Sequence, residues 1–212
     1  MAEPDPRLLS ALTTEHFVLQ SAINATVSEA AGRSSLYMMA LSSALVAVGF
    51  LAQSSDALMP FLSIVLPTVF VLGLFTVIRL IDTALEAQQY LAGIARIHRH
   101  YRALSPEAEQ AFAPRLQRWP ETVETEPSLG LGYFMALLGT SATMIACTNN
   151  LLAGAGVALL CARALALERS TSVLVGLLVF AALSVAFYVF ERWRFERGKP
   201  SLGPIGPARA PR

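Results

Sequence analysis

The chain has 212 residues, of which 54% are hydrophobic and 15% are charged, and its formal net charge at pH 7 is +1. These values argue against a soluble domain and remove a general electrostatic reason to bind nucleic acid. A bilayer core about 30 Å thick needs roughly 20 mostly apolar residues in a helix. Four stretches of the chain meet this requirement, so the sequence predicts an all-α, four-helix transmembrane protein.

The first 33 residues contain Glu15, Glu29 and other polar groups, so they do not resemble a cleaved signal peptide. Residues 7–33 instead predict a cytoplasmic amphipathic helix, because His16, Leu19 and Ile23 recur at spacings of three and four. Transmembrane helix 1 is predicted at 34–52. A short loop without basic residues, QSSDALMP, follows it.

Transmembrane helix 2 is predicted at 61–81, and residues 82–128 form a cytoplasmic helical extension and linker. In the extension Leu91, Ile94 and His98 keep a coiled-coil spacing. At about 1.5 Å per residue, His16 and His98 lie equally far from their spans, which predicts an antiparallel helical stalk. The same count predicts an interface ion pair between Arg33 and Asp82.

Ser105 and Pro106 are typical of a helix start, so a short helix is expected after the extension. Residues 137–160 and 171–190 predict transmembrane helices 3 and 4, and residues 191–212 a basic, disordered tail. Helix 3 is expected to be continuous. The alternative is a break around Asn149 and Asn150, near two closely spaced glycines.

Basic residues are distributed unevenly, with 14 of the 16 in the two tails and the middle loop. The positive-inside rule then places the N and C termini in the cytoplasm. The chain has fifteen arginines against one lysine, which suggests a GC-rich prokaryotic genome and hence a bacterial-type cell inner membrane.

Asn149 and Asn150 fall near the predicted bilayer midplane, where polar groups face protein or a water-filled path. They are candidates for pore lining or for helix packing, together with Thr140, Thr143 and Thr148. His16 and His98 could form a proton switch or metal site, but histidines in a coiled seam more commonly set register. Cys147 and Cys161 lie roughly 21 Å apart along one helix, which is too far for a disulfide.

No catalytic, cofactor or metal motif is present in the sequence, so we expect no enzyme activity and no cofactor. The leading hypothesis is a non-enzymatic membrane protein that forms homo-oligomers in the lipid bilayer. Its stalk would bind a cytoplasmic protein partner or sense a cytoplasmic condition. The alternative is a small oligomeric ion channel with a pore near Asn149 and Asn150.

Overall fold

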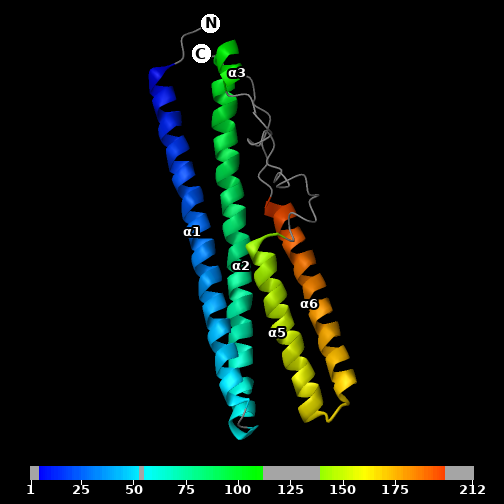
Figure 1. Ribbon diagram of the computed structural model, residues 1–212. Coiled ribbons are helices and arrows are strands. Elements are labelled where there is room, and N and C mark those ends of the chain that lie inside the picture. Colours follow the sequence, from blue (N-terminus) through cyan, green and yellow to red (C-terminus); the bar gives the residue numbers. More distant parts are fainter. Residues whose placement is uncertain (1–4, 53–54, 112–138, 199–212) are drawn as a thin grey trace. The chain divides into compact units, whose positions relative to one another are not determined.

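A computed structural model describes residues 5–52, 55–111 and 139–198 of the chain. Every element in these residues is a helix (Figure 1). The elements are α1 (Pro6–Leu51), α2 (Ser55–Arg102), α3 (Pro106–Ala111), α5 (Ser141–Ala164) and α6 (Arg169–Gly198).

Four of these helices are long and apolar enough to cross a membrane: α1, α2, α5 and α6. Their length and composition confirm the prediction of a multi-pass, all-helical membrane protein. The predicted continuity of transmembrane helix 3 is also confirmed between Ser141 and Ala164, because α5 runs through both asparagines without a break.

Several predicted helix ends differ from the structure. Helix α2 begins at Ser55 and contains Pro60, so most of the predicted loop before residue 61 is helical. Ala57, Leu58 and Met59 favour helix, and a single proline removes only one backbone hydrogen bond. Helix α5 begins at Ser141 because the Thr140 side chain caps it. The predicted linker after Ala111 and the residues before Gly139 lie outside the described part of the chain.

The prediction of a disordered tail from residue 191 is wrong for its first part. Helix α6 continues to Gly198, and Glu191 and Phe195 are both buried. Burial of these side chains against neighbouring helices stabilises two further helical turns. The basic composition of the segment did not predict them. The rest of the predicted tail, 199–212, lies outside the described residues.

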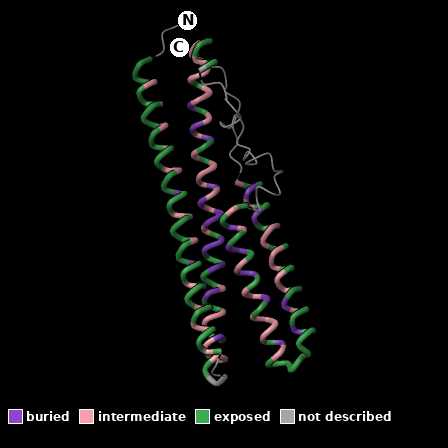
Figure 2. Tube along the Cα trace, in the orientation of Figure 1, coloured by how far each residue is buried: buried purple, intermediate pink, exposed green. Residues whose placement is uncertain are grey.

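The chain divides into two compact units. Unit 2 comprises 27–83 and 127–197, and unit 1 comprises 1–26, 84–126 and 198–212. Figure 2 shows buried residues along α2 and α5, whereas α1 and α6 are mostly exposed. Exposed apolar side chains on α1 and α6 include Phe50, Leu45, Leu178 and Val185, which suits contact with lipid.

Within unit 2, the backbones of α5 and α6 lie in close contact at two glycines. A Cβ added to Gly154 would lie 2.6 Å from the backbone oxygen of Gly176, and one added to Gly176 would lie 2.8 Å from the Cβ of Ala158. The absence of a side chain at these positions lets the two backbones pack directly, as is common between membrane helices.

Within unit 1, the first part of α1 contacts the last part of α2 at three positions. The Thr13 and Tyr101 hydroxyls are 3.3 Å apart, the His16 and His98 rings are stacked, and Leu19 packs at Gly93. The predicted start of the next helix is confirmed, because the Ser105 hydroxyl accepts a 3.1 Å hydrogen bond from the Ala108 backbone N–H.

Candidate functional site

A buried polar layer lies within unit 2, around Asn149 of α5. The Tyr37 hydroxyl donates to Oδ1 of Asn149 at 3.2 Å, and Nδ2 of Asn149 donates to the Phe70 carbonyl at 3.1 Å. Tyr37 is completely buried. Gly73 makes room for this layer, because a Cβ at that position would collide with the Asn149 amide. The Asn149 side chain therefore joins α1, α2 and α5.

Asn150 faces a different neighbour. Its Nδ2 donates to the Ser184 hydroxyl of α6 at 3.3 Å, and the residue is buried like Asn149. Thr148 donates to the Met144 carbonyl of its own helix. Both amides are thus used in contacts between helices of one chain, as in the packing interpretation. The pore alternative stays a prediction, and these hydrogen bonds add no support to it.

Thr140 and Thr143, the other two candidate pore residues, lie beside a buried carboxylate that the sequence did not single out. Glu191 of α6 is only 1% exposed. It accepts hydrogen bonds from the Thr140 hydroxyl at 3.2 Å and from the Thr143 hydroxyl at 3.2 Å. The carboxylate also lies at the N-terminus of α5, where the helix dipole favours a negative charge. These contacts make Glu191 a clamp between α5 and α6.

The predicted ion pair between Arg33 and Asp82 is not formed. The Arg33 guanidinium binds Glu29 one turn earlier on α1, at 2.8 Å, and Arg79 of α2 binds the same carboxylate at 2.8 Å. Asp82 pairs instead with Arg194 of α6. The count along the helices ignored the helical faces, and a nearer partner was available to each charge.

The two predicted stalk histidines are brought together in unit 1. The ring centroids of His16 and His98 are 5.4 Å apart with an angle of 21° between the ring planes. Nδ1 of His16 is buried and has no hydrogen-bond partner among the described residues. Burial lowers the pKa of His98, and the positive charges of His16 and Arg102 act in the same direction.

The apolar residues of the predicted seam are placed less uniformly. Leu19 packs at Gly93, which lies between the predicted seam residues Leu91 and Ile94 of α2. Ile94 is 3% exposed and Ile23 is half-buried, whereas Leu91 is 40% exposed and lies off the contact. The neighbouring Ala92 is buried instead. The spacing located the contact along each helix but assigned one α2 residue to the wrong face.

The sequence patterns do not predict the roles of Tyr37, Gly73, Glu191 or Arg194. One signal was available for Glu191, because it continues a spacing of small and polar residues on α6. Ser172, Gly176, Ser184 and Glu191 recur at four, eight and seven residues and share one helix face. No comparable periodicity marks Tyr37 or Gly73, which depend on the position of Asn149.

Residues 5–52, 55–111 and 139–198 contain no group of three or more histidine, cysteine or acidic side chains that could hold a metal ion. Cys147 and Cys161 are both free thiols. Comparisons with protein-family models, curated proteins and solved structures give no match.

Proposed function

We propose that the chain is a non-enzymatic, self-associating membrane protein that responds to cytoplasmic acidification. The contact between α1 and α2 in unit 1 would act as the sensing element and would control binding of a cytoplasmic protein partner. The stacked pair of His16 and His98 is the observation that carries this proposal.

The order of contacts supports an antiparallel stalk. Thr13, His16 and Leu19 of α1 meet Tyr101, His98 and Gly93 of α2, so rising numbers on one helix meet falling numbers on the other. The excess of basic residues in the tails and the middle loop supports a cytoplasmic location for this stalk and for both termini. In a bacterial-type cell the stalk would lie on the inner face of the inner membrane.

Protonation would weaken the stack because two imidazolium rings at this separation repel each other. From α2, Arg102 adds a further positive charge near His98, and the Tyr101 hydroxyl bonds to Thr13 one turn away. Since the pKa of His98 is lowered in the folded protein, the unfolded chain binds the proton more readily. The stabilisation that the neutral His98 ring gives the folded protein is therefore complete above pH 6.5. It is lost as the pH falls through the pKa of His98 in the folded protein.

The test measures the distance between α1 and α2 directly. Spin labels at Gln20→Cys and Gln89→Cys occupy exposed positions of unit 1. The background carries Cys147→Ser and Cys161→Ala, so that only the introduced thiols react. In lipid nanodiscs, the distance distribution should lengthen or broaden between about pH 7.5 and about pH 5.5, the range in which histidine titrates.

Replacing the two stacked histidines distinguishes their effect from nonspecific unfolding of the protein at low pH. His16→Gln combined with His98→Gln should abolish the pH response, whereas His100→Gln should retain it because His100 is exposed. An unchanged distance distribution in the parent protein at both pH values contradicts the proposal. An equal response in the double variant contradicts it as well.

A further inference from the structure

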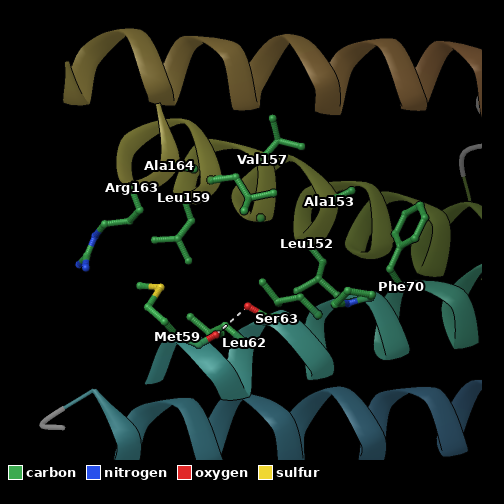
Figure 3. Close-up of a pocket in the computed structure, with 14 residues that line it drawn as sticks. Met59, Leu62, Ser63, Phe70, Leu152, Ala153, Val157, Leu159, Arg163 and Ala164 are labelled. Atoms are coloured by element: carbon green, nitrogen blue, oxygen red, sulfur yellow. Dashed lines mark hydrogen bonds between the residues drawn. The ribbon is translucent and has the colours of Figure 1, made fainter. Parts of the chain in front are cut away.

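An apolar groove of about 430 Å³ lies between α2 and α5 within unit 2. Leu66 and Phe70 line it from α2, and Ala153 and Gly156 line it from α5. In Figure 3, Met59 and Arg163 lie at one end of the groove and Phe70 lies at the other. The volume falls in the range of small-molecule sites in proteins, about 300–1,000 Å³.

Small side chains on α5 create the space. Gly156 has no side chain, and a Cβ added there would meet only Leu66 Cδ1, at an ordinary contact distance of 3.6 Å. Phe70 lies at the end of the groove opposite Arg163, and its carbonyl accepts a hydrogen bond from Asn149. Pro67, which also lines the groove, removes one backbone hydrogen bond from α2 and favours a bend there.

The length of the groove matches one leaflet of a bilayer. From Met59 to Phe70 the helix rises about 16 Å, roughly half of the 30 Å hydrocarbon core. A transmembrane helix from a second copy would need a contact face along the whole core. The acyl chain of a lipid in one leaflet spans only half of the hydrocarbon core, which is the length of this groove.

Charge is confined to one end of the groove. Arg163 is exposed, and its guanidinium makes no hydrogen bond or ion pair with the residues that the structure describes. Arg163 lies in the last turn of α5, where the helix dipole favours a cation. The dipole is equivalent to only about half a negative charge, so the guanidinium can still pair with an anion. A guanidinium at the mouth of an apolar groove is complementary to a phosphate attached to an acyl chain.

We propose that this groove binds one acyl chain of an anionic phospholipid, whose phosphate pairs with Arg163. The hydrocarbon lies along the groove between α2 and α5, and the headgroup stays at the membrane surface beside Met59. An anionic headgroup is preferred because a basic residue near a membrane surface favours anionic lipid by about 1 kcal/mol, or about fivefold.

Native mass spectrometry of the purified full-length protein tests this site. The protein in detergent is mixed with equal amounts of dioleoyl phosphatidylglycerol and dioleoyl phosphatidylcholine, and the retained lipids are counted. We expect about a fivefold preference for phosphatidylglycerol. Arg163→Gln should remove this preference, whereas the matched control Arg169→Gln, an exposed arginine outside the groove, should keep it.

Filling the groove tests the acyl-chain part separately. Gly156→Leu should lower the retention of both lipids, and Ala153→Leu provides a second filling variant if the first fails to fold. A phosphatidylglycerol with a photoreactive acyl chain should label residues 59–70 and 152–164. Equal retention of both lipids by the parent protein overturns the proposal, as does an Arg163→Gln variant with unchanged preference. The competing outcome is that Ser63→Cys forms disulfide-linked dimers. If these dimers are not labelled by the photoreactive lipid, the groove is the contact surface for a second copy of the chain and the lipid proposal is wrong.

Discussion

The close contact between α5 and α6 predicts a large effect for one added methyl group. In Gly154→Ala the new Cβ would lie 2.6 Å from the Gly176 backbone oxygen, about 0.8 Å inside the 3.4 Å at which ordinary contact begins. A backbone oxygen cannot rotate away, so the helices must separate. Overpacking of this kind costs up to about 3 kcal/mol, and the better helix propensity of alanine offsets about 1. The expected net loss of stability is about 2 kcal/mol.

Thermal unfolding in detergent measures this loss through a buried thiol. Cys161 is buried and Cys147 is exposed, so a Cys147→Ser background leaves one thiol that reacts with a fluorogenic probe only when the protein opens. For a chain of this length, about 2 kcal/mol corresponds to a decrease in Tm of about 4–8 °C.

Two matched glycines serve as controls for this experiment. Gly156→Ala adds a Cβ at an ordinary 3.6 Å from Leu66, and Gly32→Ala adds one with nothing within 4 Å. Both should leave Tm unchanged or raise it slightly, since alanine is the better helix former. A Gly154→Ala protein that melts with the parent, or a Gly156→Ala protein that melts well below it, would refute the packing argument.

Three further predictions use other contacts of the structure. Gly73→Ala should lower Tm, because the new methyl group collides with the Asn149 amide. Adding Asn149→Ala should recover part of this loss in Tm. No recovery in the double variant would show that another contact is responsible. Glu191→Leu removes the buried acceptor of hydrogen bonds from Thr140 and Thr143 and should cost about 1–3 kcal/mol. Glu196→Leu, at an exposed surface pair, should change Tm little. Equal effects of the two changes would argue against the buried clamp. Self-association predicts dimers or larger species in native mass spectra of the detergent-solubilised protein, and a stable monomer at all concentrations would exclude it.

Local chemistry made several parts of the fold predictable from sequence. The four spans follow from runs of apolar residues, and the start of α3 follows from Ser105 and Pro106. The approach of His16 to His98 follows from counting residues along two helices. Each of these depends on distance along the chain, and helices convert that distance into length at a constant rise.

Predictions that depended on the direction of a side chain around its helix were less successful. Arg33 and Asp82 were assigned to each other, but Glu29 and Arg194 are their partners. Leu91 was assigned to the seam and is exposed. A residue of error in phase rotates a side chain by about 100°, so a small error in helix rotation exchanges one neighbour for another.

The sequence by itself determined that this is an all-helical chain with four apolar spans, a capped short helix after Arg102, and two histidines at matching distances from their spans. Only the tertiary structure decided which polar groups are buried together. The Asn149 layer, the Glu191 clamp and the groove beside Arg163 each depend on side chains from two or three helices. Hydrophobic periodicity encodes which segments leave water, but hydrogen-bond partners are specified only when the helices have packed in one rotation.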